Sequence, residues 1–160
     1  MVTLQSCLKK EIENIIDNFL TINNLVDINS GGYPISFLGG SQRFKFNTFM
    51  SDIDLFYYTS KAENVIQNVL YRNNFSKIES YQEHVGISST NTSMCWYHKT
   101  LNVHIILIND FSYYQKLEKE HIEVSKYLDK NPEVLEFIKE LKSRSPIKGK
   151  FIYKSLLKMI

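Results

Sequence analysis

The sequence lacks the features that define several large classes of protein. It has only two cysteines, Cys7 and Cys95, far apart and in no spacing typical of a metal site, which argues against a disulfide scaffold or a cysteine-bound zinc ion. We expect both to be reduced and mostly buried thiols. No tract is biased enough in composition to predict disorder, and a hydrophobic content of 43% is sufficient for a core.

Long apolar runs are also missing. No run approaches the roughly 18 residues that a membrane-spanning helix requires. The first residues, MVTLQSCLKKEIENIIDNFL, mix polar and apolar side chains and do not resemble a signal peptide. We therefore expect a cytoplasmic protein with no membrane partner. Because the chain has no repeat and no long linker, its 160 residues fit one domain, or a small domain with an appendage.

The charges are unevenly distributed, although the formal net charge is only +2. Between Lys139 and Ile160 there are seven basic residues and one acid, so this tail carries +6 and the first 138 residues carry −4. Two interpretations stay open: the tail is a solvated helix face, or it is a surface that contacts phosphates.

The hydrophobic pattern predicts an α/β (α+β) fold, a small mixed sheet flanked by helices and followed by a helical C-terminal segment. We expect the core in residues 1–110 and a helical extension packed on it in residues 111–160. The expected strands are residues 35–38, 53–58, 75–79, 92–98 and 102–108, the last two forming a hairpin. The expected helices are residues 4–20, a short one from Ser41, 60–72, 112–129, 132–145 and 149–159, with a turn at 47–51.

Three details of these helices can be checked against a structure. In the first helix one stripe should contain Leu8, Ile12, Ile15, Ile16 and Phe19. Ser60-Lys61-Ala62-Glu63 has the spacing of a capping box and should open a helix with Val65, Val69 and Leu70 facing inward. Asn131 followed by Pro132 should cap the second C-terminal helix.

Two aspartates interrupt the apolar strand expected at residues 53–58. Asp52 begins the strand and Asp54 lies two residues on, so both side chains should point to the same face. Carboxylates about 7 Å apart along one face repel each other, and each raises the pKa of the other. A divalent cation would remove this repulsion, and Mg²⁺ prefers oxygen ligands while keeping positions for water and substrate phosphates.

A glycine pair before the short helix offers a place for such phosphates. Gly39 and Gly40 let the backbone turn tightly because they carry no Cβ. Ser41 then lies at the helix N-terminus, where free N–H groups and the helix dipole attract anions. Arg43, two residues later, is a candidate for a further phosphate partner.

The stretch GGSQRFKFNTFMSDIDLF, with a strand before it and a strand at its end, resembles the nucleotidyltransferase superfamily of DNA polymerase beta. The resemblance covers residues 35–58, continues more weakly to residue 108, and is greatest to two groups of small members. These are the minimal nucleotidyltransferases of toxin–antitoxin pairs and the antibiotic nucleotidyltransferases.

The resemblance implies the nucleotidyltransferase fold and a reaction. Such enzymes bind a nucleoside triphosphate with Mg²⁺, with Mn²⁺ as a possible substitute, and typically place two metal ions beside the transferred group. They move a nucleoside monophosphate to a hydroxyl group and release pyrophosphate; the acceptor here would be a protein, an RNA end or a small molecule. By this resemblance the metal ligands are Asp52 and Asp54, and the phosphate-binding residues are Gly39, Gly40, Ser41 and Arg43.

One departure from the family concerns its third carboxylate, which helps to hold the catalytic metal and activates the attacking hydroxyl. The matching segment is LNVHIILIND, in which the expected aspartate position is occupied by His104, with Asn102 on the same face and Asp110 beyond the strand. Three interpretations stay open. His104 serves as base or metal ligand, the site binds a nucleotide but transfers poorly, or another acid such as Glu79 or Glu83 fills the role.

Two functions follow from this departure. The first is an active nucleotidyltransferase with Asp52, Asp54 and His104 as catalytic residues. The alternative is a catalytically impaired protein of the same fold that binds a nucleotide or a partner protein. We expect the other histidines, His84, His98 and His121, to serve packing or surface roles. The same expectation applies to the aromatic residues that could stack on a base, which are Trp96, Tyr97, Tyr113 and Tyr114.

Overall fold

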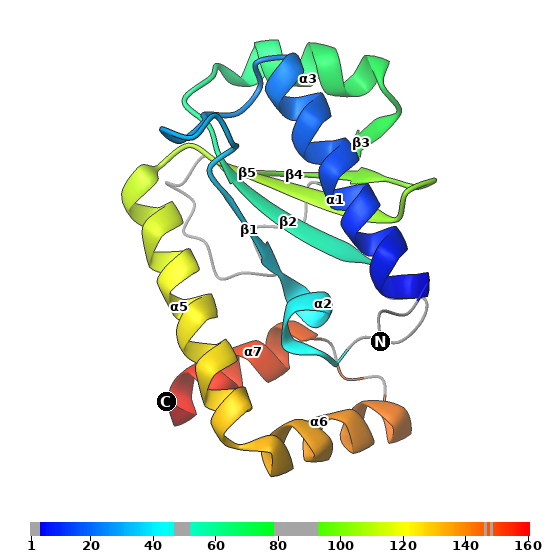
Figure 1. Cartoon of the computed structure of the whole chain (residues 1–160), viewed down its shortest axis with the longest axis vertical. Coiled ribbons are helices and arrows are strands. Elements are labelled where there is room, and N and C mark those ends of the chain that lie inside the picture. Colours follow the sequence, from blue (N-terminus) through cyan, green and yellow to red (C-terminus); the bar gives the residue numbers. More distant parts are fainter. Residues whose placement is uncertain (1–3, 47–51, 79–92, 146, 148) are drawn as a thin grey trace.

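In the computed structural model, which describes residues 4–46, 52–78, 93–145, 147 and 149–160, five strands form one mixed sheet (Figure 1). They are β1 (Ser36–Gly39), β2 (Ile53–Tyr58), β3 (Phe75–Lys77), β4 (Ser93–His98) and β5 (Val103–Ile108). Their order across the sheet is β1-β2-β5-β4-β3, with β2 and β5 parallel and the other neighbours antiparallel. The predicted α+β class with a small mixed sheet is confirmed.

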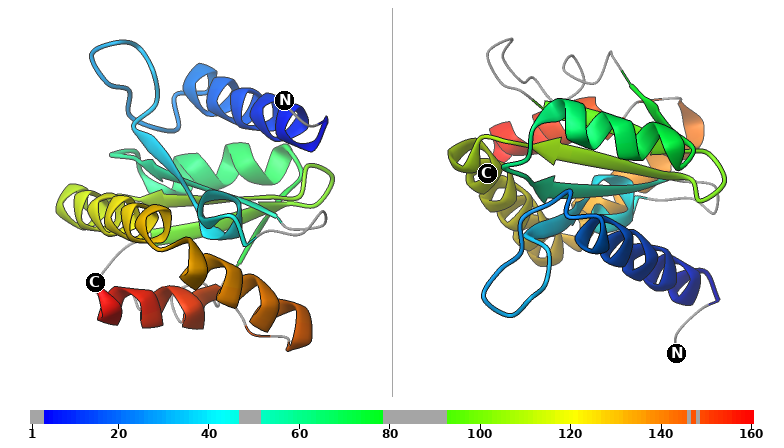
Figure 2. Two further views of the ribbon diagram at one scale, coloured as in Figure 1. Left: turned by 60° about the horizontal axis from the view of Figure 1, so that its bottom comes forward. Right: turned by 90° about the horizontal axis from the view of Figure 1, so that it is seen from above.

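Helices cover both faces of this sheet (Figure 2). Helices α1 (Leu4–Ile22) and α3 (Glu63–Arg72) pack on one face, and α5 (Phe111–Lys130) packs on the other. The short α2 (Gly40–Phe44) follows β1 directly, and α6 (Pro132–Arg144) and α7 (Gly149–Met159) end the chain. No helix in the described part of the chain is long and apolar enough to cross a membrane.

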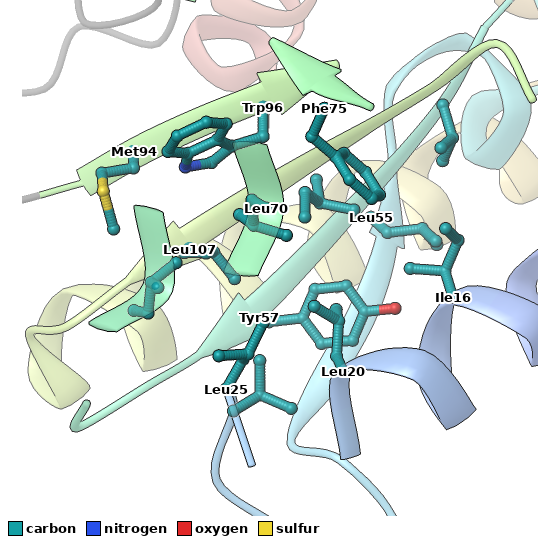
Figure 3. Close-up of a cluster of buried hydrophobic side chains, with 14 of the residues drawn as sticks. Ile16, Leu20, Leu25, Leu55, Tyr57, Leu70, Phe75, Met94, Trp96 and Leu107 are labelled. Carbon is teal, nitrogen blue, oxygen red and sulfur yellow. The ribbon is translucent and has the colours of Figure 1, made fainter. Parts of the chain in front are cut away.

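The central strands are apolar on both faces because both faces are covered. In β2, Leu55 and Tyr57 point toward α1 and α3 (Figure 3), whereas Phe56 points toward α5. The alternation follows from the two-residue period of a strand. Asp54 has the same parity as Phe56, so its side chain emerges on the α5 face, at the end of the sheet where β2 begins.

The predicted stripe of α1 is only partly correct. Ile16 is fully buried, and Ile12 and Phe19 pack against the same core. Leu8 and Ile15, in contrast, are about half exposed, at 49% and 54%. They lie seven residues apart and so share one edge of the helix, and this edge faces away from the sheet.

The start of α3 also differs from the prediction. Its N-cap is Ala62, with no side-chain cap, so the predicted capping box does not form. The Ser60 hydroxyl instead donates to the carboxylate of Asp27. Ile66 and Leu70 are the buried residues of this helix, and Val65 is 49% exposed, so its predicted inward orientation was wrong.

The C-terminal helices enclose a further apolar cluster. Phe44, Phe46, Val124, Ile138 and Leu156 are among its buried members, so this cluster joins α2 to α5, α6 and α7. α6 starts after Asn131 with a proline in its first turn, as predicted, but the Asn131 side chain donates to Tyr127 O rather than capping the helix. The predicted turn at 47–51 and the end of the 75–79 strand lie outside the described residues.

Candidate metal site

Two neighbouring strands bring Asp54 and His104 side by side. β2 and β5 run parallel, and their register pairs Asp54 with His104, while Asp52 directly precedes β2. The Nδ1 atom of His104 hydrogen-bonds Oδ2 of Asp52 and lies 3.5 Å from Oδ1 of Asp54. One ligand atom from each of the three side chains lies within 4.8 Å of the others, so together they could hold a metal ion.

The pKa values of Asp52, Asp54 and His104 are shifted in different directions. The hydrogen bond from His104 holds the pKa of Asp52 below its usual range. Burial, together with the negative charge of Asp52, raises the pKa of Asp54 to about 7. Burial acts to lower the pKa of His104, but its hydrogen bond to Asp52 and the two negative charges outweigh burial, so the pKa is raised. Near pH 7 the group therefore holds protons that a bound cation would displace.

The site is open enough to receive a ligand. The side chains of Asp52, Asp54 and His104 keep 35%, 24% and 26% of their surface exposed, respectively. The ring of Tyr97 packs beside the imidazole of His104 with a centroid separation of 4.6 Å. The Tyr97 hydroxyl donates to Asn102 Oδ1 at 2.7 Å, which fixes the ring against the histidine. Tyr97, one of the aromatic residues named from the sequence, thus lies beside the site.

The glycine pair is required by close packing. A Cβ on Gly39 would lie 2.5 Å from the ring of Phe56 and 3.1 Å from Nε2 of His121. Gly40 has a φ of +66°, and a Cβ there would lie 2.0 Å from Oδ2 of Asp54. The backbone at the start of α2 therefore contacts the side chain of Asp54 directly, and any side chain at residue 40 would prevent this contact.

Arg43 is engaged by the protein itself. Its Nε donates to Ser125 Oγ at 2.8 Å, and its Nη1 donates to Leu38 O at 2.9 Å. Burial lowers the pKa of this guanidinium, against the opposing influence of Glu118. Arg43 thus ties α2 to α5 and β1. Its contact with phosphate, like that of Ser41 in the first turn of α2, stays a prediction.

Several other residues named from the sequence lie away from the site or outside the description. Asp110 caps α5 by accepting from Tyr113 N, beyond the opposite end of β5. Trp96 and Tyr114 are buried in the two cores, so neither presents a face to a ligand. The segment containing Glu79, Glu83 and His84 lies outside the described residues.

The remaining histidines and Cys95 have packing roles. His121 is buried among the rings of Phe37, Phe44, Phe56 and Tyr153, and burial lowers its pKa to about 4. His98 packs edge-on against Phe75, and its Nδ1 accepts from Leu101 N. Cys95 is a free, buried cysteine, as predicted; the Cys7 side chain lies outside the described part.

Sequence reasoning did not connect Lys142 with the acidic group. This lysine lies on α6, and its ammonium group sits 5.5 Å from the centroid of the Phe46 ring. Burial lowers the pKa of Lys142, and the negative charge of Asp52 acts in the opposite direction. The uneven charge of the tail was the available signal, but it did not distinguish Lys142 from the other six basic residues.

The chain matches no protein-family model, no curated protein and no solved structure. The fold and the site define an α+β protein whose mixed sheet carries an Asp-Asp-His group able to hold a metal ion.

Proposed function

We propose that this protein is a metal-dependent nucleotidyltransferase, which moves a nucleoside monophosphate from a nucleoside triphosphate to a hydroxyl acceptor. The observation that carries the proposal is the convergence of Asp52, Asp54 and His104, with the carboxylate of Asp54 directly against the backbone of Gly40. The carboxylates would hold a cation, and the Gly40–Ser41 backbone would hold phosphates. The cation and the phosphates would then be immediate neighbours. Phosphoryl chemistry of this kind depends mainly on such positioning and charge neutralisation.

Asp52 and Asp54 would hold the divalent cation, which supplies charge neutralisation at the transferred phosphoryl group. The raised pKa of Asp54 fits this role, since an ion restores the charged form that burial and Asp52 oppose. Mg²⁺ is the ion implied by the resemblance. The nitrogen of His104 also suits Mn²⁺, because imidazole is a better ligand for transition metals than for Mg²⁺.

In the proposed transfer, an oxygen–phosphorus bond forms between the acceptor hydroxyl and the α-phosphorus. The bond from that phosphorus to the bridging oxygen breaks, and pyrophosphate leaves with its electron pair. The hydroxyl proton needs an acceptor, and the imidazole of His104 would take it where it does not itself coordinate the metal, with Asp52 holding its Nδ1 side. Tyr97 keeps the ring in this orientation by packing beside it.

The alternative function is a catalytically impaired protein of this fold that binds a nucleotide or a partner protein. The observation that favours it is the same histidine. His104 occupies the register position beside Asp54 where the resemblance leads us to expect a third carboxylate. Without that carboxylate, a nucleotide could bind while transfer is slow.

Transfer and binding can be separated with four nucleotides. Each of ATP, GTP, CTP and UTP is titrated with Mg²⁺ or Mn²⁺ by calorimetry, and pyrophosphate release is followed over hours. Metal-dependent binding with pyrophosphate release supports the enzyme, and tight binding without release supports the impaired protein. If none of the four nucleotides binds or turns over, the enzyme and the nucleotide-binding form of the alternative are both rejected, and only binding of a partner protein is left.

A further inference from the structure

We propose that Lys142 binds the polyphosphate of the nucleotide and so completes the site from helix α6. The inference rests on the proposed function and adds to it a residue that lies outside the sheet and the glycine turn. A lysine in this role acts as a point charge for phosphate oxygens.

The position of Lys142 is set by packing. Phe46 follows α2 closely, is 4% exposed, and belongs to the cluster that joins α2 to α6. The Lys142 ammonium lies over the ring of Phe46, an arrangement that attracts a cation to an aromatic face. Phe46 therefore holds the lysine near the C-terminal end of α2, the short helix whose first residues are Gly40 and Ser41.

The basic residues next to Lys142 on α6 form ion pairs within the helix. Lys139 pairs with Glu136 at 3.5 Å, and Arg144 pairs with Glu140 at 2.5 Å. Among the residues that the structure describes, no carboxylate lies within ion-pairing distance of Lys142. A partly buried cation without such a partner can bind an anionic ligand at a smaller desolvation cost, because burial has already removed part of its hydration shell.

The negative charge of Asp52 also acts on this lysine. The charge of Asp52 opposes the effect of burial on the Lys142 pKa. In the metal-free protein Asp52 therefore helps to keep Lys142 charged. Once a cation has neutralised the carboxylates, the positive charges of the metal and of Lys142 both face the incoming phosphates, and both favour a polyanion.

Two substitutions at Lys142 and one at a matched site test the inference. Lys142→Gln removes the charge, and Lys142→Arg keeps it. Lys139→Gln removes a charge from the same helix one turn earlier, where the side chain is exposed and pairs with Glu136. The probes are ATP, GTP, CTP and UTP, each with Mg²⁺, together with inorganic tripolyphosphate with Mg²⁺. Binding is measured by calorimetry, and urea unfolding of each variant confirms that it is folded.

For whichever nucleotide the unsubstituted protein binds, we expect Lys142→Gln to raise the Kd about tenfold, or about 1.4 kcal/mol. Tripolyphosphate binding should weaken by a similar factor, whereas Lys142→Arg and Lys139→Gln should stay within about twofold. Unchanged nucleotide affinity in Lys142→Gln overturns the role of Lys142 and leaves the proposed function standing. Failure of the unsubstituted protein to bind any of the probes overturns both.

Discussion

Gly40 and the carboxylate of Asp54 are in direct contact, so closely that a Cβ at residue 40 would lie 2.0 Å from Oδ2 of Asp54. The φ of Gly40 is +66°, a left-handed conformation that side chains disfavour. Residue 40 thus meets two separate restrictions, one from its own backbone and one from the candidate metal ligand. The two restrictions can be distinguished by experiment.

Substitution Gly40→Ala should disrupt the site. The left-handed backbone alone should cost about 1–3 kcal/mol of unfolding free energy, and the added methyl group must displace Asp54. We therefore expect at least a tenfold loss of Mn²⁺ affinity, measured by electron paramagnetic resonance. Gly32→Ala is the matched control, because Gly32 has a φ of +83° with nothing within 4 Å of a Cβ. It should lose stability but keep its metal affinity; equal losses of affinity in both variants would contradict the account.

Substitution Asp54→Asn should stabilise the metal-free protein above pH 7. The pKa of Asp54 is raised to about 7 from 3.8, so the carboxyl contributes full stability below about pH 3.8 and loses it as pH rises through 7. One pKa unit corresponds to about 1.4 kcal/mol, and 1 kcal/mol to about 2–4 °C in a chain of this size.

We expect the melting temperature of Asp54→Asn at pH 8 with chelator to rise by on the order of 5 °C. Asp129→Asn, at an exposed position of α5, provides the control and should change little. A lower melting temperature for Asp54→Asn under these conditions would mean that the ionised carboxylate is not destabilising.

Metal affinity should depend on pH. Below about pH 7 the carboxyl of Asp54 binds a proton that the metal must displace, so affinity should fall as pH decreases. The raised pKa of His104 acts in the same direction, since protonated imidazole cannot coordinate. Calorimetric titration of Mn²⁺ from pH 5.5 to pH 8 should show an increase of about tenfold per pH unit that levels off above 7. A flat profile would exclude these side chains as ligands.

Substitution His104→Asp should change the metal preference. It places a third carboxylate beside Asp54. Imidazole nitrogen is a better ligand for Mn²⁺ than for Mg²⁺, so replacing it with a carboxylate should shift the preference of the site toward Mg²⁺. We expect the ratio of Mn²⁺ to Mg²⁺ affinity to fall about tenfold, measured by competition. His98→Gln, at a histidine that packs against Phe75 on the opposite face, should leave the ratio unchanged. An unaltered ratio in His104→Asp would remove His104 from the site.

The extent of the strands and helices could be predicted well because their signals are local. The strand at Ile53–Tyr58 and the helix at Gly149–Met159 have the predicted bounds, since apolar periodicity fixes them. Orientation was harder to predict. Ser60 bonds Asp27 rather than capping α3, and Val65 is exposed, because partners distant in sequence decided both.

The same distinction applies to the site. The meeting of Asp54 with His104 was expected only from the resemblance, which placed His104 at the position of the family's third carboxylate; strand alternation alone predicted the shared face of Asp52 and Asp54. Two features were beyond local pattern: the packing of the glycine pair against Phe56 and Asp54, and the position of Lys142 over Phe46. Both depend on how α2 and α6 pack against the rest of the protein, and local sequence patterns do not determine that packing.

The most direct test of the central claim follows the α-phosphate. The protein is incubated with each of the four nucleoside triphosphates labelled at the α-phosphorus, with Mg²⁺ or Mn²⁺, and with cell extract as a source of acceptors. We predict metal-dependent transfer of label to an acceptor by the unsubstituted protein and none by folded Asp52→Asn or Asp54→Asn. Equal labelling by both variants would contradict the account, because transfer would then proceed without either carboxylate.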